Sequence, residues 1–295
     1  VTGNEWLGIT TLMISIRDWF FSHFLNPVSV SWILGTSASK IRQPSSDLGP
    51  PISGIMCLVL IAKNVRSDYP LLLAANRDEF FERPTASARF WPNDPRILAG
   101  WDERSGGTWG GITSGGRLAF LTNIRDPRSF RPSAASRGHL VRSFLQHEES
   151  ISGFIQKLIS SAHAYNGFNL IFGRGAELFW FASRGKRLCR LDQGVHALSN
   201  GSLNKPWPKA VSGARGLSRL LERPEPPSEE ELLALLADTR QAPDQDLPDT
   251  GIGLEWERFL SPVFIRGGIY GTRSQTLVLM DAAGGVRFVE RCFSG

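Results

Sequence analysis

The feature that most constrains the fold is a series of short apolar runs that come in pairs, each pair joined by a polar or glycine-rich stretch. Four pairs follow one another along the chain: residues 57–62 with 70–75, 107–113 with 117–123, 168–173 with 176–183, and 275–281 with 286–291. Short apolar runs bounded by turn residues are typical of strands, and two such runs joined by a turn are typical of a hairpin. The sequence therefore predicts an extended antiparallel sheet.

Helical periodicity lies between these strand pairs. Apolar residues from Ile151 to Ala162 recur at three- and four-residue spacing, which places them on one face of a helix. Ser228 and Glu231 form a capping-box pattern ahead of the leucine-rich run 232–236, and a third helix is predicted over 207–221. Hairpins with helices grouped between them indicate a layered α+β domain.

The first 55 residues differ from the rest of the chain. They carry no net charge and end in a Pro/Ser/Gly-rich stretch at 43–54. This change in composition predicts a domain boundary at 56 and a domain over 56–295. We expect residues 1–55 to be a poorly structured extension, upstream of the true start, which the initial Val1 fits. A loosely ordered or membrane-touching extension is the alternative. No run is long enough to span a bilayer, so no stable membrane insertion is expected.

Charge and composition narrow the classes of function. The net charge is +5, but the arginines are spread along 295 residues instead of forming a tract, so we expect no nucleic-acid partner. Cys57, Cys189 and Cys292 lie far apart, which supports neither a disulfide framework nor a zinc site. The five histidines lack ligand spacing, so no catalytic metal is predicted.

The dipeptide Met56-Cys57 stands directly before the first predicted strand. If translation begins at Met56, removal of that methionine leaves Cys57 with both a thiol and a free α-amine. An α-amine has a pKa near 8, so a sizeable neutral fraction can accept the thiol proton. The expected mature protein therefore begins at Cys57. The alternative is that Cys57 is a small apolar residue beginning a buried strand.

The second predicted strand ends in four polar residues, Asn76-Arg77-Asp78-Glu79. Because this strand adjoins the strand that starts with Cys57, Arg77 and a carboxylate could lie beside the thiol. Arg77 would favour the thiolate, and Asp78 or Glu79 would orient the amine. The alternative for such a tetrad is a solvated turn.

Several blocks occur in order along the chain: Met56-Cys57, Asn-Arg-Asp-Glu at 76–79, Arg83-Pro84, Gly-Gly-Thr-Trp-Gly-Gly at 106–111, Leu-Thr-Asn at 121–123, Tyr-Asn-Gly-Phe-Asn-Leu at 165–170, Leu-Ser-Asn at 198–200, Pro206-Trp207, Tyr-Gly-Thr-Arg at 270–273 and Glu-Arg-Cys at 290–292. Together they resemble the NRDE family, also called the transport and Golgi organisation protein 2 family, whose members resemble N-terminal-nucleophile (Ntn) hydrolases. The resemblance runs from Met56 to about Cys292. It implies a four-layer αββα Ntn-hydrolase-like sandwich with antiparallel sheets.

The resemblance also implies site residues. The catalytic set is Cys57, Arg77, Asp78, Asn123, Asn200 and Arg273, and the substrate-binding set is Asn76, Glu79 and Trp109. Asn123 and Asn200 each follow a strand, where the amide could donate to an oxyanion or could only cap a turn. Arg273 is a second candidate cation near the thiol, or a surface arginine. The glycines at 106–111 let the backbone pass close to a ligand or bend a strand.

These residues lead to one expected activity and one alternative. We expect a cytoplasmic cysteine amidohydrolase that cleaves a carbon–nitrogen bond in a small substrate and requires no cofactor. The alternative is a non-catalytic haem or acyl-lipid binding protein linked to secretory-pathway organisation, in which Cys57 or His196 would be an axial ligand of the haem. The pattern does not predict an oligomeric state.

Overall fold

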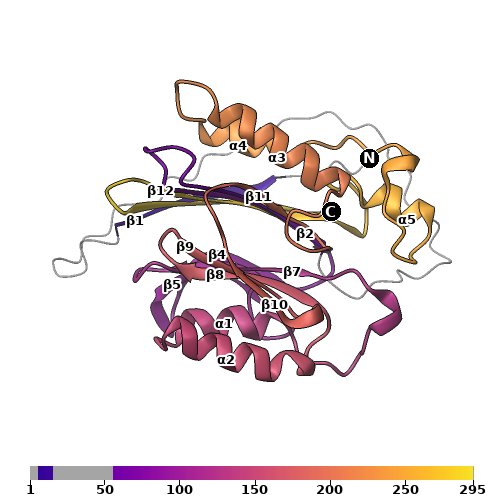
Figure 1. The fold of residues 1–295 in the computed structure, drawn as a ribbon, viewed down its shortest axis with the longest axis horizontal. Helices are drawn as coiled ribbons and strands as arrows, with labels where there is room; N and C mark the ends of the chain where they lie inside the picture. Colours follow the sequence, from indigo (N-terminus) through magenta and orange to yellow (C-terminus); the bar gives the residue numbers. More distant parts are fainter. Residues whose placement is uncertain (1–5, 16–55, 295) are drawn as a thin grey trace.

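Two antiparallel sheets stack face to face, and helices cover their outer faces (Figure 1). The computed structural model describes residues 6–15 and 56–294. The first sheet has the strand order β1-β13-β12-β3-β2-β11 and the second has the order β10-β9-β8-β7-β6-β5-β4. This is the four-layer αββα arrangement of an α+β domain with antiparallel sheets that the sequence predicts, and that prediction is confirmed.

The strands of the first sheet are β1 (Trp6–Ser15), β2 (Met56–Lys63), β3 (Leu71–Phe80), β11 (Gly194–Leu198), β12 (Tyr270–Met280) and β13 (Gly285–Phe293). Those of the second sheet are β4 (Thr85–Trp91), β5 (Asp94–Asp102), β6 (Gly110–Thr113), β7 (Arg117–Asn123), β8 (Phe168–Arg174), β9 (Glu177–Ala182) and β10 (Arg187–Arg190). All four predicted hairpins are present, as β2–β3, β6–β7, β8–β9 and β12–β13.

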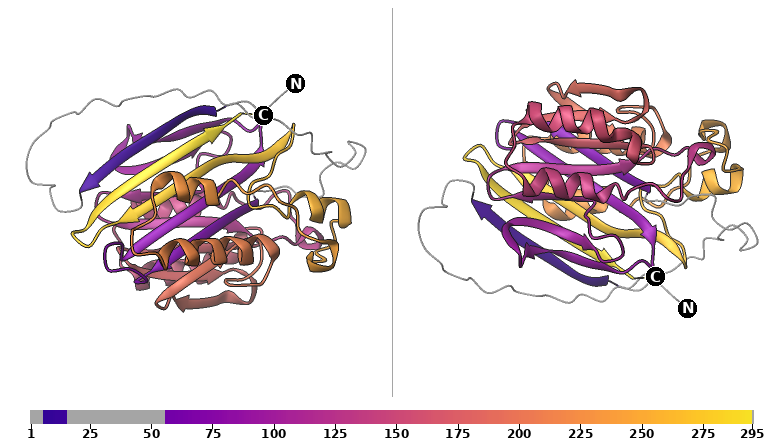
Figure 2. Two further views of the ribbon diagram at one scale, coloured as in Figure 1. Left: turned by 90° about the horizontal axis from the view of Figure 1, so that it is seen from above. Right: turned by 90° about the horizontal axis from the view of Figure 1, so that it is seen from below.

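Helices α3 (Pro208–Leu221) and α4 (Glu229–Leu235) cover the first sheet, and α1 (Gly138–Gln146) and α2 (Ile151–Ser161) cover the second (Figure 1). The short helix α5 (Leu254–Phe259) lies at one end of the sandwich, as both views in Figure 2 show. Single 3₁₀ turns occur at Pro127–Ser129, Ala162–Ala164, Arg184–Lys186 and Asp244–Asp246. Among the described residues, no helix is both long and apolar enough to cross a bilayer.

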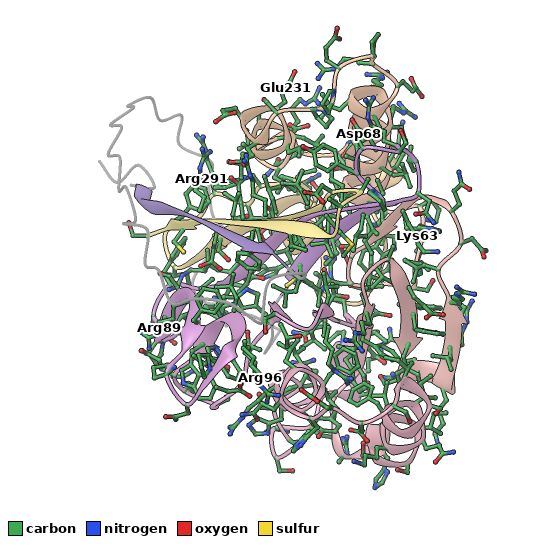
Figure 3. All side chains as sticks on the ribbon, turned by 90° about the vertical axis from the view of Figure 1, so that its left-hand side faces the viewer. Lys63, Asp68, Arg89, Arg96, Glu231 and Arg291 are labelled. Carbon is green, nitrogen blue, oxygen red and sulfur yellow. The ribbon has the colours of Figure 1, made fainter. Side chains whose placement is uncertain are left out.

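Side chains fill the space between the layers (Figure 3), and strict alternation along β2 decides which layer each one enters. Val59 and Ile61 belong to the core between the two sheets, whereas Leu58 and Leu60 pack under α3 and α4. The neighbouring strand β3 follows the same alternation, with Leu73 pointing inward. Successive side chains of a strand point to opposite faces, so the polar end of β3 is divided between the two environments.

The glycine-rich block at 106–111 permits close packing of protein against protein. A Cβ atom on Gly107 would lie 2.6 Å from the backbone carbon of Gly138, where α1 begins. A Cβ atom on Gly110 would lie 2.4 Å from the ring of Phe120 on β7. These glycines therefore bring α1 and β7 close to the 106–111 segment. The other role expected from the sequence, close passage of this backbone to a ligand, stays a prediction.

Residues 6–15 form β1, which pairs antiparallel with β13 from Trp6↔Phe293 to Ser15↔Gly285. The expected poorly structured extension thus contains one paired strand, because β13 has a free edge that this apolar run can join. Residues 1–5 and 16–55 lie outside the described residues. For them, and for the position of the true start, the expectation stays a prediction.

Candidate active site

Cys57 lies near the start of β2 on the face between the two sheets, and 3% of it is exposed. Burial raises the pKa of its thiol to about 12, and the nearby Asp78 carboxyl adds to this rise. The charges of Arg77 and Lys209 and a backbone hydrogen bond from Asp78 lower it. The expected effect of Arg77 therefore has the predicted sign, but burial outweighs it. The thiol is protonated at neutral pH.

Arg77 is the cross-strand partner of Cys57, so its side chain enters the same layer. Its guanidinium carbon lies 4.2 Å from the ring centroid of Trp109, and its Nη2 lies 3.8 Å from Oε2 of Glu79. Arg83 approaches the same Glu79 oxygen at 3.6 Å. Two guanidinium groups therefore neutralise Glu79, and the buried cation of Arg77 rests on an aromatic ring.

Asp78 points to the opposite face of the first sheet and is fully buried. Its Oδ1 accepts a hydrogen bond from Thr272 Oγ1 at 2.6 Å, and its Oδ2 lies 3.4 Å from Lys209 Nζ. Burial raises the pKa of Asp78 and lowers that of Lys209. In the register of β2 and β3, Met56 pairs with Asp78 and Cys57 pairs with Arg77, so the backbone nitrogen of Cys57 lies between the two pairs.

Asn123 and Asn200 come from different sheets and meet at the same end of the sandwich. Asn200 follows β11, which pairs with β2 as far as Leu198↔Val59, and its Nδ2 donates to the carbonyl oxygen of Asn123 at 2.9 Å. Both polar atoms of the Asn123 amide are buried, and neither has a hydrogen-bond partner among the described residues. The Asn123 amide is therefore the available donor, and Asn200 holds it in place.

Arg273 occupies the bulge between Thr272 and Ser274 in β12. Its Nη1 donates to the carbonyl oxygens of Phe80, Phe81 and Arg83 at 2.8, 3.2 and 3.1 Å. It was expected as a second cation beside the thiol, but its side chain instead anchors the turn after β3. The bulge accounts for this placement, because an extra residue in one strand redirects its side chain.

A cavity of about 910 Å³ opens between the end of β3, the 102–109 segment and the start of α1. Of the predicted site residues, Glu79, Trp109 and Asn123 line it, together with Arg83 and Arg137. Cys57 does not line it and is almost fully buried. The cavity wall therefore carries the Asn123 amide and the Trp109 ring. The guanidinium of Arg77, the cross-strand partner of Cys57, lies over that ring.

Asn76, predicted to bind substrate, does not reach this cavity. It alternates with Arg77, so it points toward the helices, where its Nδ2 donates to the carbonyls of Leu236 and Val263 at 2.8 and 2.7 Å. The structure thus places Asn76 in an anchoring position away from the cavity.

Three charged residues near the site were missed by sequence reasoning, of which Glu290 and Lys209 are buried and Arg137 is half-buried. Glu290 accepts a hydrogen bond from the Ala88 amide at 2.6 Å, and alternation from the inward-pointing Phe288 would have placed it between the sheets. Lys209 could have been noticed as a lysine on the sheet-facing side of a predicted helix. Arg137 precedes α1, which the sequence did not predict, and carries no local signal. Among the described residues, no cluster of three His, Cys, Asp or Glu side chains could hold a metal.

Comparisons with known proteins place the chain in a family. A family model described as Transport and Golgi organisation 2 matches residues 56–295. The human and mouse Transport and Golgi organization 2 homologs are 36% and 35% identical to this chain, each over 256 residues that cover 80% of it and 92% of the relative. The Drosophila melanogaster protein is 27% identical and covers 81% of this chain and 93% of its own length.

One solved structure with a similar arrangement is the Caenorhabditis elegans N-acylethanolamine-hydrolyzing acid amidase ortholog. Its TM-score is 0.47 at 12% identity, over 77% of this chain and 93% of that chain. The family assignment rests on the match of the family model to residues 56–295 and on the identity to the human and mouse proteins, and does not use this structure. The chain belongs to the Transport and Golgi organisation 2 family.

Proposed function

We propose that this protein is a cysteine Ntn amidohydrolase that acts on a small amide once its chain begins at Cys57. The observation that carries the proposal is the convergence of three groups at one end of the sandwich. They are the buried Cys57 thiol, the carboxyl of Asp78, which pairs with Met56 on the neighbouring strand, and the Asn123 amide on the cavity wall.

The α-amine of Cys57 supplies the base in this proposal. An upstream peptide bond would turn that nitrogen into an amide without basicity, so the chain has to begin at residue 57. The register of β2 and β3 supports the role, because the freed amine would lie next to Asp78. Thr272 and Lys209 hold the Asp78 carboxyl in position, and a carboxylate there stabilises the ammonium form.

The chemistry follows the positions of these groups. The Cys57 sulfur bonds to the substrate carbonyl carbon while the thiol proton passes to the α-amine. The carbonyl oxygen becomes an oxyanion, which accepts a hydrogen bond from Asn123 Nδ2. The carbon–nitrogen bond breaks as the ammonium returns the proton to the leaving nitrogen. Water, losing a proton to the amine, then hydrolyses the thioester and restores the thiol.

A raised thiol pKa is compatible with this sequence of steps. The amine removes the proton during attack, so the free enzyme does not need to hold a thiolate. Arg77 stabilises the negative charge that develops on sulfur, while its contacts with Trp109 and Glu79 fix its orientation. Asn200 and Arg273 are positioning residues, since one holds Asn123 and the other holds the turn after β3.

The test compares a chain that begins at Cys57 with one that retains residues 1–56. Each is incubated with a panel of small N-acyl amides and with a cysteine-directed acyl probe, and acyl-enzyme is followed by intact mass. We expect labelling and turnover only in the shorter chain. Cys57→Ala should reduce its turnover at least about 1000-fold. Cys57→Ser, which is nearly isosteric, should also reduce turnover steeply while the domain stays folded. Cys189→Ser is the matched control, because Cys189 is exposed on β10.

Two results would contradict the proposal. One is undiminished activity in the chain that retains residues 1–56. The other is stoichiometric haem binding in a spectroscopic titration with no acyl-enzyme across the panel, which would favour the carrier expected as the alternative. His196, the haem ligand in that alternative, does not line the 910 Å³ cavity.

A further inference from the structure

Arg137 is a cation that lines the 910 Å³ cavity. Its Nη1 donates to the carbonyl oxygen of Gly167 at 3.1 Å, and it makes no salt bridge within the described part of the chain. Arg83, on the same wall, is paired with Asp102 at 2.7 Å. Burial lowers the pKa of Arg137 to about 10. A half-buried guanidinium that faces a cavity without a salt-bridge partner among the described residues is a ready binding group for an anion.

The start of α1 adds to the attraction of this wall for an anion. Ser136, Arg137 and Gly138 all line the cavity, and the nine-residue helix begins at Gly138. No side chain caps this helix, and its first turn holds no acidic residue. The amides of His139 and Leu140 already donate to the carbonyl oxygens of Ser136 and Arg137, at 3.1 and 3.0 Å, so the attraction comes from the dipole at the helix N-terminus, which favours negative charge. Arg137 and the backbone of α1 therefore act on the same region.

A third feature links this wall to the proposed reaction. Asn123 lines the same cavity and is 5% exposed, and within residues 6–15 and 56–294 neither polar atom of its amide has a hydrogen-bond partner. The Glu79 carboxylate and, when it is ionised, the Cys57 thiol are among the groups that raise the pKa of Arg137. Because Arg77 and Arg83 neutralise Glu79, that carboxylate does not cancel the positive wall.

We infer that the substrate is an anionic amide whose carboxylate or phosphate group binds Arg137 and the N-terminus of α1, while its carbonyl lies at Asn123 and Cys57. The inference rests on the proposed hydrolase function. The apolar part of the ligand is expected to lie toward Phe130 and Ile269, exposed hydrophobic residues that also line the cavity. Arg137 is then a specificity-determining residue that was absent from the predicted site.

The binding experiment does not depend on turnover. It uses a chain that begins at position 57 and carries Cys57→Ala, titrated by calorimetry with three ligands of one acyl chain: N-hexanoylglycine, the phosphate ester of N-hexanoylethanolamine, and neutral N-hexanoylethanolamine. We expect at least one anionic ligand to bind at least about tenfold more tightly than the neutral one, which corresponds to about 1.4 kcal/mol. The preferred anion tells a carboxylate site from a phosphate site.

Variants then assign the preference to Arg137. Arg137→Gln should reduce the affinity for the anionic ligands about tenfold and leave the neutral ligand within twofold. Arg137→Lys, which keeps the charge, should restore part of the difference. Arg104→Gln is the matched control, because Arg104 lines the same cavity but is exposed. The thermal midpoint of each variant shows whether it is folded.

Turnover of the same three amides by the chain with Cys57 intact separates the two proposals. Anion binding that depends on Arg137, without turnover of any amide, would support the anion site and contradict the hydrolase. Equal losses for anionic and neutral amides in Arg137→Gln would show that Arg137 serves the reacting oxygen of any substrate, and would overturn the inference. So would wild-type binding that favours the neutral ligand.

Discussion

The chemistry of Cys57 depends on its depth in the molecule more than on its neighbours. Arg77 and Lys209 both favour the thiolate, yet burial raises the thiol pKa to about 12. The free energy lost when the thiolate is removed from water exceeds the stabilisation that the Arg77 guanidinium provides. That guanidinium also interacts with Glu79 and Trp109. A base next to the sulfur is therefore required for attack near neutral pH.

This depth predicts slow alkylation of Cys57 in the chain that retains residues 1–56. A raised pKa lowers the thiolate fraction at every pH below it, so at pH 8 a pKa of about 12 leaves roughly one thiolate in ten thousand. Iodoacetamide labelling, read by peptide mass spectrometry between pH 8 and 10, should be far slower at Cys57 than at the exposed Cys189. Equal labelling rates at pH 8 would contradict the buried thiol.

At the scale of elements, the position of α1 depends on a contact between two glycines. Gly107 precedes β6 and packs against Gly138, and the Thr108 amide donates to the Gly138 carbonyl at 3.3 Å. This contact sets where the uncapped end of α1 meets the cavity. The helix is therefore placed by the backbone of the 106–111 segment together with the apolar residues that it buries.

We predict that Gly107→Ala destabilises the protein by about 1–3 kcal/mol, because the new Cβ would meet backbone atoms that cannot rotate away. Chemical denaturation gives the free energy of unfolding. Gly115→Ala is the control, since its Cβ would meet only Thr113 Oγ1, at 3.7 Å. Its effect should stay within about 0.5 kcal/mol. A similar cost at both positions would contradict the close contact.

The elements that could be predicted from the sequence are those with a clear period. The four hairpins and helices α2, α3 and α4 carry it, and the capping box at Ser228 is formed as predicted, with Ser228 and Glu231 bonded in both directions. Strand β10 could not be found because all four of its residues are exposed, so it lacks alternation. Helix α5 has six residues, too few for a helical period to show.

The candidate site was predictable where a local motif carried it. Arg77 and Asp78 were identified from one tetrad, but only the alternation along β3 separates their two environments. The positions of the Arg137 and Lys209 side chains depend on which helix covers which sheet, and the position of the Arg273 side chain depends on a bulge in β12. A single sequence shows neither feature. The resemblance supplied the catalytic set, and three-dimensional packing supplied the residues around it.

At the scale of the whole molecule, one buried ion pair joins the α5 region to both sheets. Arg125 follows β7 and pairs with Glu257 of α5, and its backbone amide donates to the Asn200 carbonyl at 2.9 Å. Glu257 also accepts hydrogen bonds from the amide and hydroxyl of Thr250. The position of Asn200 is therefore tied to the segment that carries α5.

We predict that Arg125→Met destabilises the protein by about 3–5 kcal/mol, because it leaves the Glu257 carboxylate buried without its partner. The double variant with Glu257→Leu should recover part of this loss. Arg258→Met is the matched control, since its pair with Asp244 is exposed and is expected to contribute about 0–1 kcal/mol. Denaturation midpoints provide the comparison. Equal losses for both arginines would contradict the role of the buried pair.

The pairing of β1 with β13 gives the position of the first residue a second consequence. A chain that begins at Cys57 lacks β1, so the backbone amide and carbonyl groups along that side of β13 face solvent. An unpaired strand edge can form hydrogen bonds with a strand of another molecule. Charged residues along the strand, such as Arg287 and Arg291 of β13, commonly oppose this pairing. Removal of residues 1–56, which would free the α-amine of Cys57, would thus also leave β13 with an unpaired edge that another strand can join. Light scattering of the long and short chains would detect any self-association that accompanies activation.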